Sequence, residues 1–439
     1  MSATLKPDEL NICLQEAIQR FMRANPKSQQ QHARAASVLP GGNTRTVLFN
    51  DPFPIALVSA AGARVTSLDG REYFDFLGEY TAGLYGHTNP AIANALKRAV
   101  DRGIVMGGHT CLEEEFAGLL RGRFPSLERL RFTNSGTEAN LMAISVARAT
   151  TGRSKVVVFE GAYHGSVFGF GDPPNSLNAP FDFVVAPYND IKATVALMAD
   201  IRSDVAAVIV EPMLGSGGCI PAEAQFLQRL RSWCSQHAAL LIFDEVMTSR
   251  LSPGGLQALH GIRPDLTTLG KYLGGGLSFG AFGGRAEIMN RFDPRIAGFY
   301  VHAGTFNNNV LTMSAGIAGL AEVLTVDAVT ALNRRGETLR AKLNELAAAA
   351  NVSMQFTGMG SMMNVHMCAD PIRNYRDAAR GNSRLRDLLY FDLLEDGIWC
   401  ARRGMFNLSL AMGETEFEGL YGAINAFVTR RRGLLDEYR

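Results

Sequence analysis

The chain has 439 residues, of which 47% are hydrophobic and 19% are charged. At about 150 residues per domain, this length predicts roughly three domains, or one large domain with a smaller one. The 43 Lys and Arg residues nearly balance the 42 Asp and Glu residues, so the formal net charge is +1. This balance argues against a dedicated nucleic-acid partner, and the apolar fraction argues against disorder.

The sequence predicts neither a membrane span nor an export signal. It contains no run of about 20 apolar residues, and residues 1–7 are not followed by the apolar stretch of a secretory signal. The six cysteines form no CxxC pair, so neither a metal site such as zinc nor a disulfide framework is expected. A cytoplasmic, reduced, soluble enzyme is therefore the expectation.

Residues 1–85 are expected to form an N-terminal segment with a helix and a small sheet. Four apolar residues recur at helical spacing before Pro26, which ends the pattern: Leu10, Leu14, Ile18 and Phe21. Three strand-like runs follow at residues 55–59, 64–68 and 72–76. The dipeptide Asp69-Gly70 is a hairpin signal between the last two.

Residues 86–320 are expected to form a large α/β domain. Three nearly continuous apolar runs suit strands that are buried on both faces of a helix-covered, mostly parallel sheet: residues 156–159, 205–210 and 238–243. Each run stops at a carboxylate, namely Glu160, Glu211 and Asp244. Ligands of open α/β sheets bind beyond such strand ends, although an acid can also simply mark the point where solvent begins, which is the interpretation preferred for Glu160.

Residues 321–439 are expected to form a C-terminal small domain of mixed α and β structure. The predicted helices span residues 323–350, 384–394 and 416–431, and the predicted strands span residues 353–356 and 361–367. Together with the N-terminal segment, this region predicts a second, smaller domain built from both ends of the chain.

The tripeptide Ser135-Gly136-Thr137 is a candidate phosphate site. It follows the strand-like run 130–132 and opens a helix-length run to residue 150. The free amides and the positive dipole end of a helix start favour phosphate, and two hydroxyls would add donors. An ordinary helix cap is the alternative.

Three further residues have chemistry suited to a cofactor site. Asp244, at the end of an apolar strand, needs a cation or hydrogen bonds to stay charged, and a protonated ring nitrogen is one such partner. Lys271 lies among apolar residues and glycines, and a desolvated lysine attacks carbonyls to form a Schiff base. Tyr163 follows a strand and is suited to stacking on a planar ring. The alternatives are a lysine beside a flexible turn and a structural tyrosine.

Together and in this order, the motifs resemble the pyridoxal-phosphate enzymes of the class III aminotransferase family. The matching residues are 135–139, 163–165, 211–212, 244–248, 270–271 with 274–276, and 304–305. The resemblance runs from about residue 35 to the end. It implies fold type I, with a seven-stranded-type sheet in the large domain, and a homodimer whose active sites lie at the subunit interface.

The resemblance also implies roles for the matching residues around the cofactor ring. Lys271 would carry pyridoxal 5'-phosphate covalently and then act as acid and base for the proton shift. Asp244 would keep the ring nitrogen protonated, so that the ring acts as an electron sink. Tyr163 would stack on one face of the ring and Val246 would pack on the other. Glu211 would support the region of the ring hydroxyl.

The phosphate site would be completed across the dimer. By the same resemblance, Ser135, Gly136 and Thr137 would cradle the phosphate, and Thr305 would reach it from the partner subunit.

Within the family, the chain most resembles a branch shared by glutamate-1-semialdehyde aminomutases and aromatic β-amino acid aminotransferases. In the β-amino acid enzymes, an arginine matching Arg45 binds the substrate carboxylate, for which a planar fork is well suited. A second arginine, matching Arg402, binds the α-carboxylate of the acceptor, and the adjacent Arg403 competes for this role. A surface ion pair is the alternative for either arginine. Four residues are expected to line an apolar pocket, unless they belong to the core: Tyr80, Tyr163, Phe168 and Met247.

Two segments favour the aromatic β-amino acid branch over the aminomutase. Residues 166–174 are largely apolar and aromatic, and Gly304-Thr305 is followed by Phe306 and three asparagines. The predicted reaction moves the amino group of a β-amino acid such as β-phenylalanine to a 2-oxo acid such as 2-oxoglutarate or pyruvate. The alternatives are glutamate-1-semialdehyde 2,1-aminomutase and a non-catalytic, cofactor-binding regulator. The regulator is disfavoured because the chain shows no DNA-binding extension and retains Lys271 and Asp244.

Overall fold

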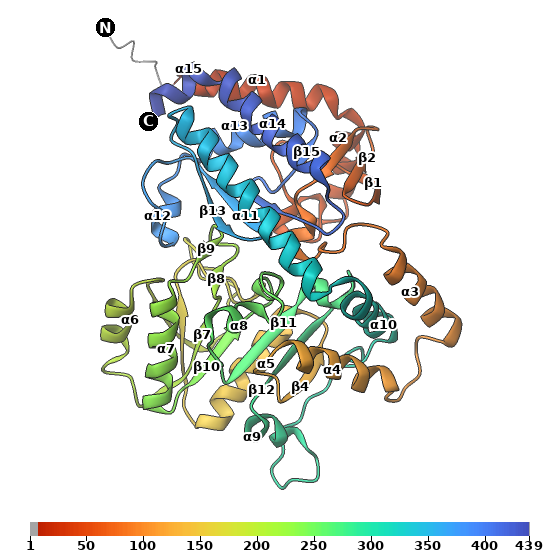
Figure 1. Cartoon of the computed structure of the whole chain (residues 1–439), viewed down its shortest axis with the longest axis vertical. Helices are drawn as coiled ribbons and strands as arrows, with labels where there is room; N and C mark the ends of the chain where they lie inside the picture. The colour runs from red at the N-terminus through yellow and green to blue at the C-terminus, as the bar shows by residue number, and fades with distance from the viewer. Residues whose placement is uncertain (1–7, 439) are drawn as a thin grey trace.

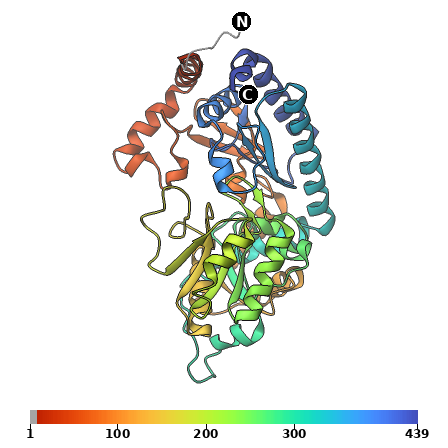
Figure 2. The same cartoon turned by 90° about the vertical axis from the view of Figure 1, so that its left-hand side faces the viewer.

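The computed structural model describes residues 8–438 (Figure 1). Residues 1–7, which bear on the expected lack of an export signal, lie outside the described residues. The large sheet occupies the lower half of Figure 1, and the smaller sheets occupy the upper half. Figure 2 shows the two halves stacked along the long axis, with the first and last described helices both in the upper half.

A seven-stranded sheet with the order β4-β12-β11-β10-β7-β5-β6 forms the centre of the lower half. Strand β12 runs antiparallel to both of its neighbours, and all other neighbouring pairs are parallel. The strands are β4 (Arg129–Thr133), β5 (Lys155–Phe159), β6 (Asp182–Ala186), β7 (Val205–Val210), β10 (Leu240–Asp244), β11 (Leu266–Gly270) and β12 (Gly280–Gly284). The predicted α/β class with a mostly parallel sheet is confirmed.

The central strands are apolar because helices cover the sheet. Every residue of β7 and β10 is buried, which explains runs without polar alternation. The covering helices include α5 (Gly136–Thr151), which contacts β11 and β12, and α7 (Ala224–His237), which contacts β7 and β10. The other helices of this half are α3 (Pro90–Arg102), α4 (Cys111–Arg123), α6 (Ile191–Met198), α8 (Gly255–His260), α9 (Ala286–Met289) and α10 (Val310–Ala318).

Strand β12 lacks an apolar run, because its neighbours approach too closely for side chains. A Cβ atom on Gly280 would lie 2.1 Å from the backbone oxygen of Ser135. One on Gly284 would lie 2.0 Å from the backbone oxygen of Asp265. Glycine is therefore required where the strand passes the start of α5.

Two smaller sheets occupy the upper half. One contains β1 (Leu57–Ala61), β2 (Arg64–Ser67), β3 (Glu72–Asp75) and β15 (Ile398–Trp399); the other contains β13 (Gln355–Met359), β14 (Met362–His366) and β16 (Met405–Asn407). A short hairpin pairs β8 (Met213–Leu214) with β9 (Ile220–Pro221). Because β15 pairs with β3, both ends of the chain contribute to one sheet, as expected. The proposed domain boundaries after residues 85 and 320 stay predictions.

The helices of the upper half are α1 (Asp8–Ala24), α2 (Pro26–Ala36), α11 (Val326–Ala349), α12 (Tyr375–Ala379), α13 (Ser383–Glu395), α14 (Glu414–Arg430) and α15 (Arg432–Leu435). Pro26 ends the pattern of α1 and also opens α2, which the sequence did not predict. A proline fits the first turn of a helix because the amide that it lacks has no partner there.

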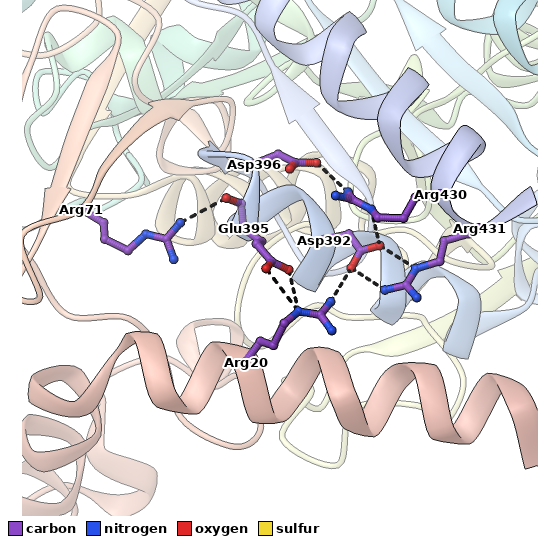
Figure 3. Close-up of polar contacts among 7 residues, drawn as sticks. All are labelled: Arg20, Arg71, Asp392, Glu395, Asp396, Arg430 and Arg431. Carbon is purple, nitrogen blue, oxygen red and sulfur yellow. Dashed lines mark hydrogen bonds and ion pairs between the residues drawn. The ribbon is translucent and has the colours of Figure 1, made fainter.

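A buried carboxylate, Asp392 of α13, links α1 to α14 (Figure 3). Its oxygens accept hydrogen bonds from Arg431 Nε at 2.9 Å and from Arg20 Nη2 at 3.4 Å. Arg430 Nε lies 3.7 Å from the same side chain. Arg20 also pairs with Glu395 at 2.9 Å. These contacts attach the N-terminal helix to two C-terminal helices.

Among residues 8–438, no single helix is long and apolar enough to cross a membrane. Only the segments Val310–Val323 and Val326–Ala349, which are bent by 78° relative to each other, reach that length and composition when taken together.

Candidate active site

The predicted polar residues meet where the strands of the large sheet end. Glu211 follows β7, Asp244 ends β10 and Lys271 follows β11. Asp244 is paired in register with Thr268 on β11, so the ends of these two strands lie side by side. The charges of Asp244 and Glu211 both act on the Lys271 amine. The three residues therefore form one cluster at the carboxyl edge of the sheet, where α/β proteins bind ligands.

The Asp244 carboxylate is buried and accepts three hydrogen bonds. Asn140 Nδ2 and His164 Nδ1 each donate to Oδ2 at 2.8 Å. The backbone amide of Val246 donates to Oδ1 at 3.0 Å. These donors offset the desolvation of the carboxylate and fix its orientation.

Asn140 and His164 are site residues to which the sequence assigned no role. Asn140 also donates to the His164 backbone oxygen at 2.8 Å and accepts a hydrogen bond from Thr268 Oγ1 at 2.6 Å. The signal for Asn140 is a polar residue on the buried face of α5, next to Ala139 and Ala143. Within the described residues, His164 Nε2 is buried and has no hydrogen-bond partner.

Lys271 has an unusual backbone and an unusual amine. Its φ of +56° lies in the left-handed region, which costs energy for a residue with a side chain. Burial and the positive charge of Arg403 together lower the pKa of the amine to about 8, against the opposing charges of Asp244, Glu79 and Glu211. A larger fraction of neutral amine is therefore present near pH 8 than on an ordinary lysine.

The predicted phosphate cradle lies at the start of α5. Ser135 is the N-cap residue, and its Oγ accepts a hydrogen bond from the Glu138 amide at 3.1 Å. Thr137 Oγ1 accepts one from the Ser166 amide at 3.2 Å. Both hydroxyls keep their own protons as donors, so capping and phosphate binding are compatible.

Val246 packs between two glycines beside this cradle. A Cβ atom on Gly136 would lie 2.9 Å from Val246 Cγ1, and one on Gly270 would lie 3.1 Å from it. The valine therefore lies next to both the start of α5 and Lys271.

Glu211 fixes the loop that carries Tyr163. Its Oε1 accepts a hydrogen bond from the Tyr163 amide at 2.9 Å, and its Oε2 accepts one from the Gly215 amide at 3.0 Å. Burial, with a smaller contribution from the charge of Asp244, raises the pKa of Glu211 to about 7, against the opposing effects of His164 and of the two backbone hydrogen bonds. Tyr163 is 46% exposed, so its ring is accessible for stacking.

The two neighbouring arginines point to different places. Arg402 makes a two-pronged contact with Asp387, at 2.9 and 3.0 Å, and donates to the Asp51 backbone oxygen at 2.7 Å. Arg403 instead lies over the Tyr80 ring, 5.1 Å from its centre, and its charge acts on Lys271. The sequence prediction chose Arg402, but the structure places Arg403 beside the cluster.

Arg45 lies beside Tyr80, on the same side of the Lys271 cluster as Arg403. Arg45 Nη2 pairs with Glu79 at 2.7 Å, and its guanidinium is 6.0 Å from the centre of the Tyr80 ring. The Tyr80 hydroxyl donates to the Val47 backbone oxygen at 3.0 Å.

The other expected pocket residues differ in position. Met247 is buried and belongs to a cluster that Tyr80 also contacts. A Cβ atom on Gly215 would lie 2.4 Å from its sulfur. Phe168 is fully buried against Phe181 and Phe183, so it belongs to the core. Thr305 is exposed, and its predicted role in a partner subunit stays a prediction.

Comparison with known proteins gives matches over nearly the whole chain. Residues 49–412 match the model of the family described as Aminotransferase class-III. The β-phenylalanine transaminase of Variovorax paradoxus is 51% identical, over 97% of this chain and 98% of its own length. A crystal structure of a β-phenylalanine aminotransferase from that organism has a TM-score of 0.96, with 97% of this chain and 99% of that chain covered.

Two more distant relatives have different names. A glutamate-1-semialdehyde 2,1-aminomutase of Methanothermobacter thermautotrophicus is 38% identical, over 85% of this chain and 91% of its own length. The crystal structure of an omega-transaminase from Sphaerobacter thermophilus has a TM-score of 0.87 at 37% identity, with 92% of this chain and 98% of that chain covered.

Proposed function

The chain belongs to the class-III aminotransferase family, and on that premise we propose that it transfers the amino group of an aromatic β-amino acid to a 2-oxo acid. The cofactor is pyridoxal phosphate, and the fold is the fold type I of this family. The observation that carries the proposal is that Lys271 lies close enough to Asp244 to feel its charge, and that Asp244 is buried and accepts three hydrogen bonds. The similarity to the Variovorax paradoxus enzyme supports the substrate class.

The described residues fit this cofactor. The amides and hydroxyls at the start of α5 match a phosphate group, and the Asp244 carboxylate at the sheet edge matches a protonated ring nitrogen. When bound, pyridoxal phosphate supplies a ring that stabilises negative charge on the substrate carbon. Asp244 would hold the ring nitrogen, and Ser135, Gly136 and Thr137 would hold the phosphate.

Lys271 would bind the cofactor and move the proton. Because its pKa is about 8, its amine is partly neutral at physiological pH and accepts a proton readily. The amine-bearing carbon of the donor would lose its proton to Nζ, and in the second half of the reaction the former carbonyl carbon of the acceptor would receive a proton from Nζ. Tyr163 and Val246 would hold the ring from its two faces, and Glu211 would fix the Tyr163 loop.

Two arginines would recognise the carboxylates of donor and acceptor. Arg45 lies beside Tyr80 and would bind the carboxylate of the β-amino acid. For the acceptor we propose Arg403 in place of Arg402, since Arg402 already holds the Asp387 carboxylate with both prongs of its guanidinium. Tyr80 and Met247 would form the apolar side of the pocket.

We propose that the enzyme is a homodimer with shared sites. Two segments of the chain, residues 104–108 and 301–308, carry exposed apolar side chains. A hydrogen bond joins the two segments, since Asn308 donates to the Gly108 backbone oxygen at 3.1 Å. The exposed apolar residues are Ile104, Val105, Met106, Val301 and Phe306. An exposed apolar patch of this kind marks an interaction surface. Thr305 lies within it and would face the partner.

A cytoplasmic location is part of the proposal. All six cysteines are free of disulfides, which suits a reducing compartment.

The test is a panel of amino donors with the holoenzyme. We expect β-phenylalanine to give a β-keto acid, and 2-oxoglutarate or pyruvate to give glutamate or alanine, with no turnover when the acceptor is left out. Borohydride reduction followed by peptide mapping should place the cofactor label on Lys271. Isomerisation of glutamate-1-semialdehyde without an acceptor, together with no reaction of β-phenylalanine, would contradict the proposal.

A further inference from the structure

The segment that carries Glu79 and Tyr80 has a strained backbone. Four consecutive residues have positive φ angles: Gly78 at +53°, Glu79 at +45°, Tyr80 at +52° and Thr81 at +82°. Three of them have side chains, for which the left-handed region is unfavourable. Such a run persists only where the surrounding structure holds it.

Contacts from three parts of the chain hold this segment. Asp75 Oδ1 accepts hydrogen bonds from the amides of Leu77 and Gly78, both at 2.9 Å. At the other end, the fully buried Arg250 donates to the Thr81 backbone oxygen at 3.2 Å. Asn407 Nδ2 donates to the Leu77 backbone oxygen at 2.8 Å. The positions of Glu79 and Tyr80 are therefore fixed by the fold.

This fixed segment places a carboxylate on the arginine that would bind substrate. Glu79 Oε1 lies 2.7 Å from Arg45 Nη2, and the two side chains are 53% and 47% exposed. An incoming carboxylate can therefore reach the guanidinium, but it has to replace a carboxylate that is already there. The Glu79 charge also raises the pKa of the Lys271 amine, so the pair is close enough to influence the charge of that amine.

We infer that Glu79 is a specificity-determining residue whose carboxylate occupies Arg45 until the carboxylate of the amino donor replaces it. The inference rests on the proposed function. Exchange leaves Glu79 without its partner and close to a second negative charge, so each carboxylate donor binds more weakly than Arg45 alone would allow. An amine without a carboxylate does not displace Glu79 and escapes this penalty.

The experiment compares two donors of similar shape in the holoenzyme. β-Phenylalanine carries the carboxylate, and 1-phenylpropylamine, the control amine, lacks it. In Glu79→Gln we expect the KM for β-phenylalanine to fall by about two- to fivefold, the range that corresponds to an exposed ion pair. The KM for the control amine should not change. Glu79→Asn should act in the same way, since asparagine tolerates a positive φ.

A matched control is present elsewhere in the chain. Arg64 and Glu72 form an ion pair of the same length, 2.7 Å, with exposed fractions of 42% and 56%. Glu72→Gln should leave the KM values for both donors unchanged. In an Arg45→Met background, Glu79→Gln should lower the KM for β-phenylalanine less than it does in the wild-type background, because only the repulsion between the two carboxylates is then relieved.

A binding measurement separates this inference from the proposed function. Calorimetry with 3-phenylpropanoate, which has the carboxylate but no amine, requires no turnover. Tighter binding to both Glu79 variants than to wild type supports the inference. Equal or weaker binding, or an equal fall in KM for both donors, overturns it. If wild type fails to convert β-phenylalanine, that result contradicts the proposed function alone.

Discussion

Arg402 and Arg403 are neighbours in sequence, yet their side chains have different environments. Sequence matching cannot choose between them, because the turn before β16 decides which side chain faces the cluster. The structure provides that information through the Asp387 contact of Arg402 and the Tyr80 contact of Arg403. Phe168 is a similar case, because an aromatic residue near a motif can belong to the core or to a pocket. The positions of Glu211 and Asp244 at the sheet edge, by contrast, were predictable because each follows or ends an apolar strand, whereas Lys271 was singled out by its apolar and glycine neighbours.

Exchange of each arginine for methionine tests their assignment. Arg403→Met should raise the KM for the acceptor 2-oxoglutarate by about tenfold or more, because a charge-assisted contact to a carboxylate is lost. Arg402→Met should chiefly lower thermal stability, because Asp387 loses its partner. Steady-state kinetics and thermal unfolding of both variants provide the measurement. The reverse pattern would assign the acceptor site to Arg402.

Glu211 should give the apoenzyme a pH-dependent stability. Its pKa is raised to about 7 from an ordinary value of 4.5, so the folded state binds the extra proton. The stabilisation is complete below about pH 4.5 and is lost as the pH rises through about 7. Relative to Glu211→Gln, wild type should lose on the order of 2 kcal/mol between pH 5 and pH 8. Parallel unfolding midpoints of the two apoproteins over this range would contradict the expectation.

At the scale of the helices and strands, apolar patterning predicts the strands whose side chains are buried on both faces. It does not predict a strand whose glycines are required by close backbone packing. The predicted run at residues 205–210 has the same bounds as strand β7, because both faces of this strand are covered. Strand β12 escapes the pattern, because its glycines are selected by close approach of the backbone. Helix α2 was not predicted from the apolar pattern either, because Pro26 is compatible with the end of one helix and with the first turn of the next.

The link between α1, α13 and α14 depends on Asp392. Asp392→Asn should destabilise the protein by about 1–3 kcal/mol, because three partly exposed arginines lose a buried counter-charge. Asp396→Asn is the control, since its 2.8 Å pair with Arg430 involves an accessible carboxylate and should cost less than about 1 kcal/mol. Chemical denaturation of both variants measures the difference. Equal effects would mean that burial of Asp392 adds nothing to the link.

At the scale of the whole molecule, the family resemblance indicated the fold and the reaction class, and both are confirmed. The subunit arrangement cannot be obtained from patterning, because an exposed apolar residue alone does not reveal its partner. The structure adds the observation that the two segments with exposed apolar residues are joined by the hydrogen bond from Asn308 to Gly108.

Val105→Glu tests the proposed dimer. Val105 is 85% exposed and lies in the apolar patch, so a charge there should disfavour association. We expect gel filtration to shift toward the monomer and cofactor retention to fall, because in the proposed dimer Thr305 of one subunit would complete the phosphate site of the other. Val326→Glu, on α11 and 61% exposed, is the control that should stay dimeric. An unchanged elution volume for Val105→Glu would place the interface elsewhere.

The pairing of β3 with β15 has a consequence for biosynthesis. On the ribosome, β3 emerges long before residues 398–399 exist, whereas all strands of the large sheet are complete once residue 284 has been made. Domains generally fold as units during synthesis. The nascent enzyme should therefore acquire its central sheet first, while its earliest strands lack their last neighbour. Premature termination before residue 398 would then leave a finished lower half beside an upper half that cannot close.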